Sequence, residues 1–129
     1  MTATEPQLKD GRIVGIAGPV VDVEFPPHAL PKINTAIEFD VEVDGVTTAV
    51  RAEVAQQLGE SRVRAVAMKP TDGLRRGQAV RNLGETITVP VGDVTLGHIW
   101  NVIGEPLDVP ADTLDIKERW SIHRHAPDF

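Results

Sequence analysis

The sequence predicts an all-β protein in which a small closed six-stranded antiparallel barrel runs from Gly11 to Gly84. Three observations carry this prediction. Eleven glycines and ten prolines punctuate the 129 residues at short intervals. The stretches between them alternate apolar and polar residues, as half-buried strands of small barrels do. No stretch of helical length shows a helical period, which excludes a helical fold.

The first two strands are expected on either side of a bend at Gly18-Pro19. Residues 13–16 are mostly apolar and form a first short strand. Val21, Val23 and Phe25 then alternate with two acidic residues, which predicts a strand with one buried face. Two consecutive prolines end this strand, and a proline-containing loop leads to the next one.

The next two strands are predicted to form a hairpin around Asp44-Gly45, because Asp-Gly favours the positive φ angles of a two-residue turn. This turn sets a register in which four pairs of side chains share the barrel interior. The pairs are Val43–Val46, Val41–Thr48, Phe39–Val50 and Ile37–Ala52. The same register places Glu38 opposite Arg51 on the outer face, and an exposed ion pair of this kind contributes about 0–1 kcal/mol.

Two further strands complete the predicted barrel. Residues 57–60 are expected to form a turn, and residues 62–67 alternate arginine with apolar side chains, which predicts a fifth strand. Residues 70–77 are rich in turn-forming types and connect it to a short last strand, residues 79–83, which Gly84 closes.

The pattern changes after Gly84. Residues 86–89 resemble a strand that ends at Pro90, and no period of either kind runs from Leu107 to Phe129, so we expect no independent core there. The predicted parts are a flexible N-terminal segment (1–10), the barrel (11–84) and a further segment (85–129).

The composition excludes several classes of protein. There are 19 acidic and 13 basic residues, so a net charge of −6 argues against nucleic acid as a partner. The absence of cysteine excludes disulfides, thiolate metal sites and cysteine nucleophiles. The longest apolar stretch, residues 13–21, is about half of the roughly 20 residues that a membrane-spanning helix needs. We therefore expect a soluble protein without a signal peptide or direct membrane insertion.

The sequence contains no recognisable catalytic motif. None of the four lysines follows a glycine, which excludes a Gly-Lys-Ser/Thr phosphate loop. Ser61 and Ser121 do not lie in a nucleophile elbow. His123 and His125, with Asp128 beyond, have the spacing of a metal-binding pair on a strand. No third ligand occurs at a useful spacing, so we interpret them as an exposed cluster.

Other polar residues also favour structural roles. His98 beside Trp100 indicates packing rather than catalysis, and Arg75-Arg76 is interpreted as a solvated turn in preference to a site for an acidic partner. The acids at alternate positions of residues 38–42 are interpreted as the wet face of a strand rather than a catalytic pair. The residues by themselves therefore favour a binding or assembly module over an enzyme.

Several longer motifs occur in a fixed order along the chain. They are Gly11-Arg12-Ile13-Val14, Gly18-Pro19-Val20-Val21-Asp22-Val23-Glu24-Phe25, Glu53-Val54-Ala55-Gln56-Gln57-Leu58-Gly59, Pro70-Thr71-Asp72-Gly73-Leu74, Val89-Pro90-Val91-Gly92 and Asn101-Val102-Ile103-Gly104-Glu105-Pro106-Leu107-Asp108. In this order they resemble the start of the beta, catalytic, subunit of F-type ATP synthases. The tail, Trp120-Ser121-Ile122-His123-Arg124, is similar to actinobacterial members. The alpha subunit shares the late motifs, but the early ones favour beta.

The resemblance implies that the barrel is the N-terminal crown domain, in which three alpha and three beta barrels alternate in a ring. Residues from about Thr86 would be the incomplete, β-rich start of an α/β nucleotide-binding domain. The chain ends at Phe129, before the family's phosphate loop, so we expect it to be part of a longer subunit. No catalytic, cofactor-binding or metal-binding residue of the family can be carried over to it.

The resemblance also implies the activity of the parent complex, a proton-translocating rotary enzyme that makes ATP from ADP and phosphate. Mg-ATP or ADP and the rotor subunit would be bound by parts of the subunit beyond this chain. The complex would lie peripherally on the cytoplasmic face of the bacterial membrane. The chain by itself is expected to be non-catalytic, to hold no cofactor and to be mainly monomeric, with a weak dimer through residues 86–129.

Two other hypotheses stay open from the residues. An alpha-type or vacuolar-type subunit would have the same barrel. A free-standing barrel that binds a peptide or an oligosaccharide would need exposed aromatic side chains. The chain has no tyrosine, and Phe25 and Phe39 both lie on faces predicted to be buried.

Overall fold

The computed structural model describes residues 8–129, which divide into two compact units with a boundary between Glu85 and Thr86. The N-terminal segment predicted to be flexible lies mostly outside the described residues, and its last part, Leu8 to Asp10, has no regular secondary structure.

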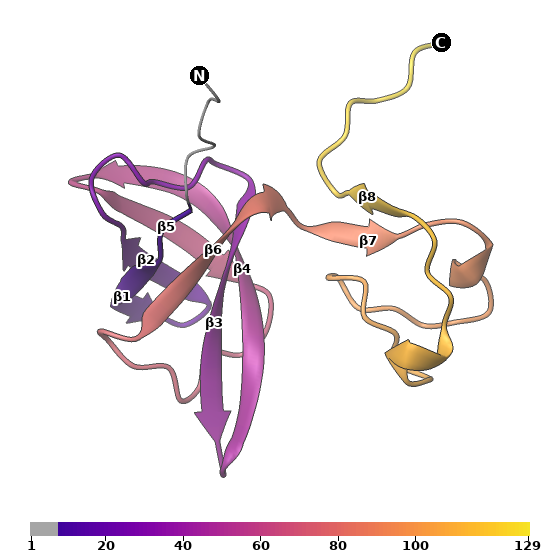
Figure 1. Cartoon of the computed structure of the whole chain (residues 1–129), viewed down its shortest axis with the longest axis horizontal. Coiled ribbons are helices and arrows are strands. Elements are labelled where there is room, and N and C mark those ends of the chain that lie inside the picture. The colour runs from indigo at the N-terminus through magenta and orange to yellow at the C-terminus, as the bar shows by residue number, and fades with distance from the viewer. Residues whose placement is uncertain (1–7) are drawn as a thin grey trace, which may run out of the picture. The chain divides into compact units, whose positions relative to one another are not determined.

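The first unit is a closed barrel of six strands (Figure 1). The strands are β1 (Gly11–Ala17), β2 (Val20–Glu24), β3 (Thr35–Val43), β4 (Val46–Gly59), β5 (Arg62–Ala67) and β6 (Ala79–Thr86). They follow the order β1-β2-β5-β4-β3-β6 around the barrel. β6 closes onto β1 through antiparallel pairing that aligns Gly11 with Val80. The predicted six-stranded antiparallel barrel is thus confirmed.

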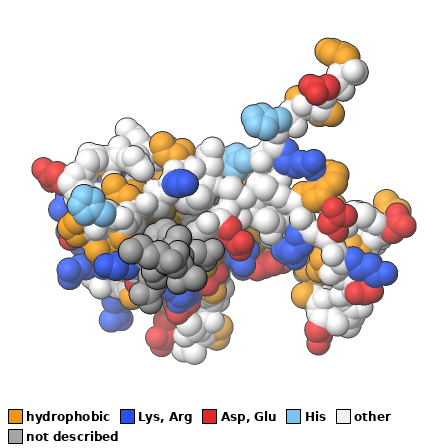
Figure 2. All heavy atoms as spheres, turned by 45° about the horizontal axis from the view of Figure 1, so that its top comes forward, with side chains coloured by type: hydrophobic (Ala, Val, Ile, Leu, Met, Phe, Trp, Pro, Cys, Tyr) orange, Lys and Arg blue, Asp and Glu red, His pale blue; other side chains and the backbone are white. Residues whose placement is uncertain are grey.

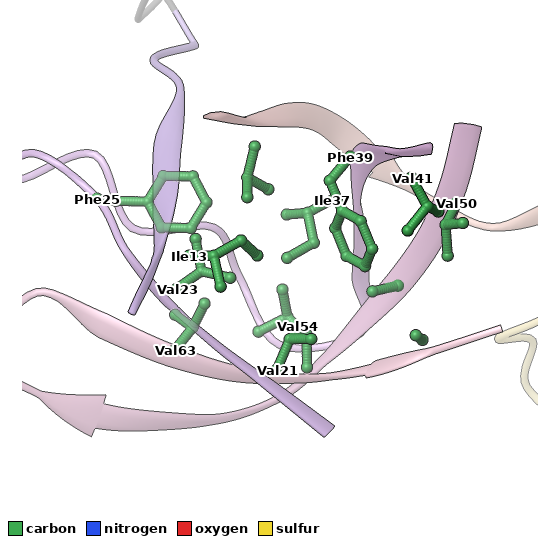
Figure 3. Close-up of a cluster of buried hydrophobic side chains, with 14 residues drawn as sticks. Ile13, Val21, Val23, Phe25, Ile37, Phe39, Val41, Val50, Val54 and Val63 are labelled. Carbon is green, nitrogen blue, oxygen red and sulfur yellow. The ribbon is translucent and has the colours of Figure 1, made fainter. Parts of the chain in front are cut away.

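Alternate side chains from all six strands fill the barrel with an apolar core, shown in part in Figure 3. The buried members are Ile13, Val21, Val23, Phe25, Ile37, Phe39, Val41, Val50, Ala52, Val54, Val63, Ala65, Ala67 and Val80. Among the described residues no polar or charged side chain is buried. Burial of apolar surface, at roughly 25 cal/mol per Å², is therefore the main stabilising term of this barrel.

The β3–β4 hairpin has the predicted register, but its end extends beyond the barrel (Figure 1). All four predicted pairs are present, and Glu38 lies opposite Arg51. Val43, Val46 and Thr48, however, are exposed, so the prediction that they line the interior is wrong. They lie on the face of the ribbon that continues from the barrel interior, but the barrel ends before it reaches them.

β4 is longer than the sequence predicts, since it runs through most of the expected turn at residues 57–60. The turn lies instead at Glu60-Ser61, where both residues have positive φ. Register shifts near Gln56 and Leu58 interrupt the pairing of β4 with β5. Such bulges bend a strand, which lets β4 pair with β3 at its start and with β5 at its end. The last strand, β6, likewise continues past Gly84 to Thr86.

The second unit contains a two-stranded antiparallel sheet of β7 (Thr88–Pro90) and β8 (Arg119–Ser121). Two short 3₁₀ helices, η1 (Asp93–Thr95) and η2 (Ala111–Thr113), lie in the connection between these strands. β8 falls in the region where no element is predicted. A strand of three residues is too short to show a period, and its position depends on pairing with β7.

A small part of the second unit is buried within this described chain. Ile87 and Ile103 are almost fully buried, whereas Leu96, Ile99, Val102 and Leu107 are exposed. Trp100 pairs with Pro106 across the turn that carries these side chains, and the Leu107 amide donates to the Ile99 carbonyl at 2.8 Å. The loop is thus ordered by backbone hydrogen bonds while its apolar side chains face outward.

Candidate functional site

The outer face of the barrel carries ion pairs between neighbouring strands. Arg64 on β5 makes two hydrogen bonds to Asp22 on β2, at 2.9 and 3.1 Å. Arg62 lies 3.4 Å from Glu24, two residues further along the same pair of strands. The register of β2 and β5 sets these contacts, because it aligns Asp22 with Arg64 and Glu24 with Arg62. The arrangement links β2 to β5 across the outer face of the barrel.

A second cluster centres on Arg81 of β6. Its guanidinium binds Asp40 through two hydrogen bonds, at 2.9 and 3.1 Å, and Glu38 at 2.9 Å. Arg51 approaches the same Glu38 from β4 at 3.4 Å. The binding of these carboxylates by Arg81 supports their interpretation as structural rather than catalytic. Sequence reasoning missed Arg81, because β3 and β6 are about forty residues apart.

The ion pairs change the electrostatics of the barrel surface. The hydrogen bond from Arg64 lowers the pKa of Asp22, and the one from Arg81 lowers the pKa of Asp40. Figure 2 shows acidic and basic side chains mixed over the visible face. Glu38 and Asp40 therefore do not present two unpaired negative charges, since Arg81 lies 2.9 Å from each carboxylate and Arg51 lies 3.4 Å from Glu38.

Loss of stability in acid follows from the Asp22 pair. A lowered folded-state pKa means that the carboxylate contributes stability above the pKa of the unfolded chain, and that this contribution is lost as the pH falls through the folded-state pKa. We expect Asp22→Asn to lower Tm at neutral pH, and the difference from the original protein to shrink as the pH falls below the ordinary aspartate pKa of about 3.9. Thermal melts across this range measure the effect.

Asp115→Asn is the control for that experiment. Asp115 is strongly exposed and lies 3.8 Å from an equally exposed Lys117, so the substitution should change Tm little at any pH. A deficit of Asp22→Asn that stayed constant from neutral pH into acid would contradict the assigned role of the carboxylate.

The polar residues singled out in the sequence do not converge on one site. His98 Nδ1 lies 2.9 Å from Asp108 Oδ2, and this hydrogen bond lowers the pKa of Asp108. His98 also meets the Trp100 ring edge-on at 6.3 Å between centroids. These contacts tie together the two ends of the loop around Trp100. The pairing with Asp108 lacked a sequence signal, since ten residues without a period separate the two side chains.

The remaining candidates lie apart from one another. Arg75 and Arg76 are exposed in the β5–β6 connection. The Ser121 hydroxyl lies 2.5 Å from that of Thr86, so it is part of a structural contact between chain segments. Ser61 forms the turn between β4 and β5. His123 and His125 are exposed beyond β8.

Residues 8–129 were left with two further kinds of site to consider, a metal centre and a membrane span. No group of three or more histidine, aspartate or glutamate side chains in this range is arranged to hold a metal ion. No helix in the same range is long and apolar enough to cross a membrane.

The surfaces that remain are those suited to contacts with other chains. One is the end of the β3–β4 hairpin, where Val43 and Val46 are 49% and 65% exposed. Another is the outward-facing loop of the second unit, with Leu96, Ile99 and Leu107. Exposed apolar side chains gathered in this way are typical of surfaces that another chain covers. Within the described residues these two groups of exposed apolar side chains are the candidate contact surfaces.

Comparison with protein families identifies the barrel. A family model described as "ATP synthase alpha/beta family, beta-barrel domain" matches residues 13–84. The matched range begins within β1 and ends within β6, so it coincides with the closed barrel.

Proposed function

This chain belongs to the ATP synthase alpha/beta family, and we propose that it is the assembly barrel, with the adjoining segment, of a beta subunit. The observation that carries the proposal is a closed barrel with a wholly apolar core over the residues that match the family. Because its own side chains fill the interior of this barrel, the outer surface and the strand ends remain for contacts with other subunits. Its function is then to hold subunits together rather than to catalyse.

The choice of beta over alpha is supported by two of the early motifs. Gly18-Pro19-Val20-Val21-Asp22 forms the β1–β2 turn and the start of β2, with Gly18 at a positive φ of 59° and Asp22 bound to Arg64. Residues 53–56 lie where β4 passes from pairing with β3 to pairing with β5. Both motifs thus lie in ordered turns and strands of the barrel, and the choice of beta rests on their resemblance to the beta subunit.

In this proposal the barrel alternates with alpha barrels around a ring, and the complete subunit makes ATP with proton flow as the source of energy. Mg-ATP or ADP is bound by other parts of the complete subunit, which also contacts the rotor. The complex lies peripherally on the cytoplasmic face of the membrane. The outward-facing Leu96, Ile99, Val102 and Leu107 then pack against the rest of the nucleotide-binding domain.

The test is whether the chain prefers an alpha-type partner to itself. We expect the chain alone to be mainly monomeric at micromolar concentration, because a ring of identical barrels would need a contact that alternating subunits do not use. Co-expression with the alpha-type subunit of the same organism should give a mixed complex, detected by light scattering after size-exclusion chromatography. A homohexamer that survives dilution, or the absence of any mixed complex, would contradict the proposal. Preferential assembly with a beta-type subunit would identify the chain as alpha instead.

The chain by itself is expected not to bind Mg-ATP. None of its lysines follows a glycine, so no lysine and amide cradle is available for the phosphates, and the net charge of −6 repels a polyanion. Calorimetric titration should give no measurable heat of binding at nucleotide concentrations up to about 1 mM. A micromolar dissociation constant would show that a nucleotide site exists within these residues.

A further inference from the structure

The end of the β3–β4 hairpin is a two-stranded ribbon with one open edge. β4 pairs with β3 from Val46 to Glu53, but its pairing with β5 covers only the part from Ala52 to Gly59. Residues 46–50 of β4 therefore have a neighbour on one side alone. This stretch lies at the end of the hairpin that extends beyond the other strands (Figure 1).

The backbone groups of Thr47 and Ala49 point to that open edge. Residues opposite each other in an antiparallel pair alternate between hydrogen-bonded and outward-directed, and Val43–Val46 closes the turn as a bonded pair. This alternation directs the backbone amides and carbonyls of residues 47, 49 and 51 away from β3. The carbonyl of Arg51 accepts from the Met68 amide at 2.9 Å on this side, which supports the assignment. Within the described chain no hydrogen bond occupies the amides or carbonyls of Thr47 and Ala49.

The opposite edge of the ribbon is covered. On β3 the outward-directed residues are Asp40 and Glu42, and Gln78 donates its side-chain amide to the Asp40 carbonyl. Gly73 packs so closely on the Glu42 carbonyl that a Cβ at this position would overlap it. The ribbon thus has one edge closed by the β5–β6 connection and one edge available.

The open edge lacks the features that prevent an exposed strand from pairing with a strand of another chain. Residues 46–50, Val-Thr-Thr-Ala-Val, contain no charge and no proline, and the register shifts of β4 all lie further along the strand. Three of the five residues are exposed β-branched side chains, which favour extended backbone. An exposed edge of this kind is a template for another strand.

The two faces of the ribbon specify what an added strand would carry. On one face Val46 and Thr48 are exposed and continue the row of apolar residues from the barrel interior. On the other face Thr47 and Ala49 are small, and Glu42 lies directly across from Thr47 on β3. Within the described residues no ion pair or hydrogen bond occupies the Glu42 or Asp44 carboxylates. Strands lie about 4.8 Å apart, so a long cationic side chain on an added strand can extend over Thr47 to Glu42.

We propose that the open β4 edge at residues 46–50 binds an extended segment of another protein, whose side chains alternate between apolar and lysine or arginine. Its backbone pairs with the amides and carbonyls of Thr47 and Ala49. Its apolar side chains contact Val46 and Thr48, and its cations approach Glu42 and Asp44. The interaction is independent of the subunit type proposed above.

A second copy of this chain is a poorer occupant of the edge. The pairing segment of that copy, residues 46–50, has no cationic side chain, and Arg51, which follows it, already lies 3.4 Å from Glu38 of its own chain, so Glu42 and Asp44 would gain no free cation. Two copies would also bring their acidic hairpin ends together, and the net charge of −6 on each adds to this repulsion.

The test uses the whole ¹⁵N-labelled chain and a capped peptide of about seven residues that alternates lysine and valine. We expect the peptide to shift the amide signals of Thr47 and Ala49 and to slow their hydrogen exchange about tenfold at saturation. A peptide with glutamate in place of lysine should bind about tenfold more weakly, since its charges face Glu42 and Asp44. Unchanged exchange at Thr47 and Ala49 with the lysine peptide would overturn the proposal.

Three variants separate backbone pairing from simple charge attraction. Ala49→Pro removes an amide that bonds nothing within the hairpin, and it should abolish slowed exchange at Thr47, while Ala49→Val keeps the amide and should bind normally. Glu42→Gln should weaken binding of the lysine peptide several-fold without affecting the fold. If Ala49→Pro fails to fold, Glu42→Gln still tests the proposed contact. Equal binding by all three variants would contradict strand addition. Protection of Thr47 and Ala49 that rises with protein concentration, without peptide, would identify a second copy as the occupant.

Discussion

Phe39→Ala is expected to lower the free energy of unfolding of the barrel by about 3–5 kcal/mol. The Phe39 ring is fully buried and lies in the middle of the interior row formed by β3 and β4 (Figure 3). Its removal loses apolar burial and leaves a cavity that the closed strands cannot collapse to fill. In a domain of this size each kcal/mol lowers Tm by roughly 4–8 °C, so thermal melts followed by circular dichroism measure the change directly.

Phe129→Ala is the matched control, because it removes the same ring from a position that is wholly exposed. We expect its free energy of unfolding to lie within about 0.5 kcal/mol of that of the original protein. Two variants that melt at the same temperature would show that the apolar row containing Ile37, Phe39 and Val41 does not form the interior.

Gly73→Ala is expected to cost roughly 2–3 kcal/mol, because two separate penalties add at this position. Gly73 has φ = +90°, a conformation that a residue with a Cβ rarely adopts. A Cβ would also overlap the Glu42 carbonyl oxygen and touch Val43. Because both neighbours belong to β3, the β5–β6 connection would have to move away from the hairpin.

Gly77→Ala separates the two penalties. Gly77 lies in the same connection with φ = +83°, but a Cβ there would have nothing within 4 Å. We therefore expect only the backbone penalty, about 1–2 kcal/mol, so Gly73→Ala should be the less stable variant in urea denaturation. Equal urea midpoints for the two variants would show that the close approach of Gly73 to Glu42 does not affect the free energy of unfolding.

Local patterns made the hairpin the most predictable part of this protein. Asp44-Gly45 favours a two-residue turn, and this turn determines which residues of β3 and β4 face each other. The Glu38–Arg51 contact followed from that register and is present. These features depend on residues that are close in sequence, so periodicity and turn chemistry suffice to find them.

The candidate site was less accessible to sequence reasoning. Arg81 binds Glu38 and Asp40 only because β6 is placed beside β3 when the barrel closes. His98 meets Asp108 through a loop with no regular period. The open β4 edge depends on where β5 stops pairing, which no local pattern specifies.

The sequence by itself determined the strands, the hairpin register and the face of each strand that is apolar. Tertiary structure alone decided how far along each strand that face is buried. Val43, Val46 and Thr48 continue the same apolar row as Phe39 and Val50, yet they are exposed because β5 and β6 do not extend alongside them. Side-chain alternation is a property of one strand, whereas burial requires neighbours, and the neighbours of a barrel strand come from distant parts of the chain.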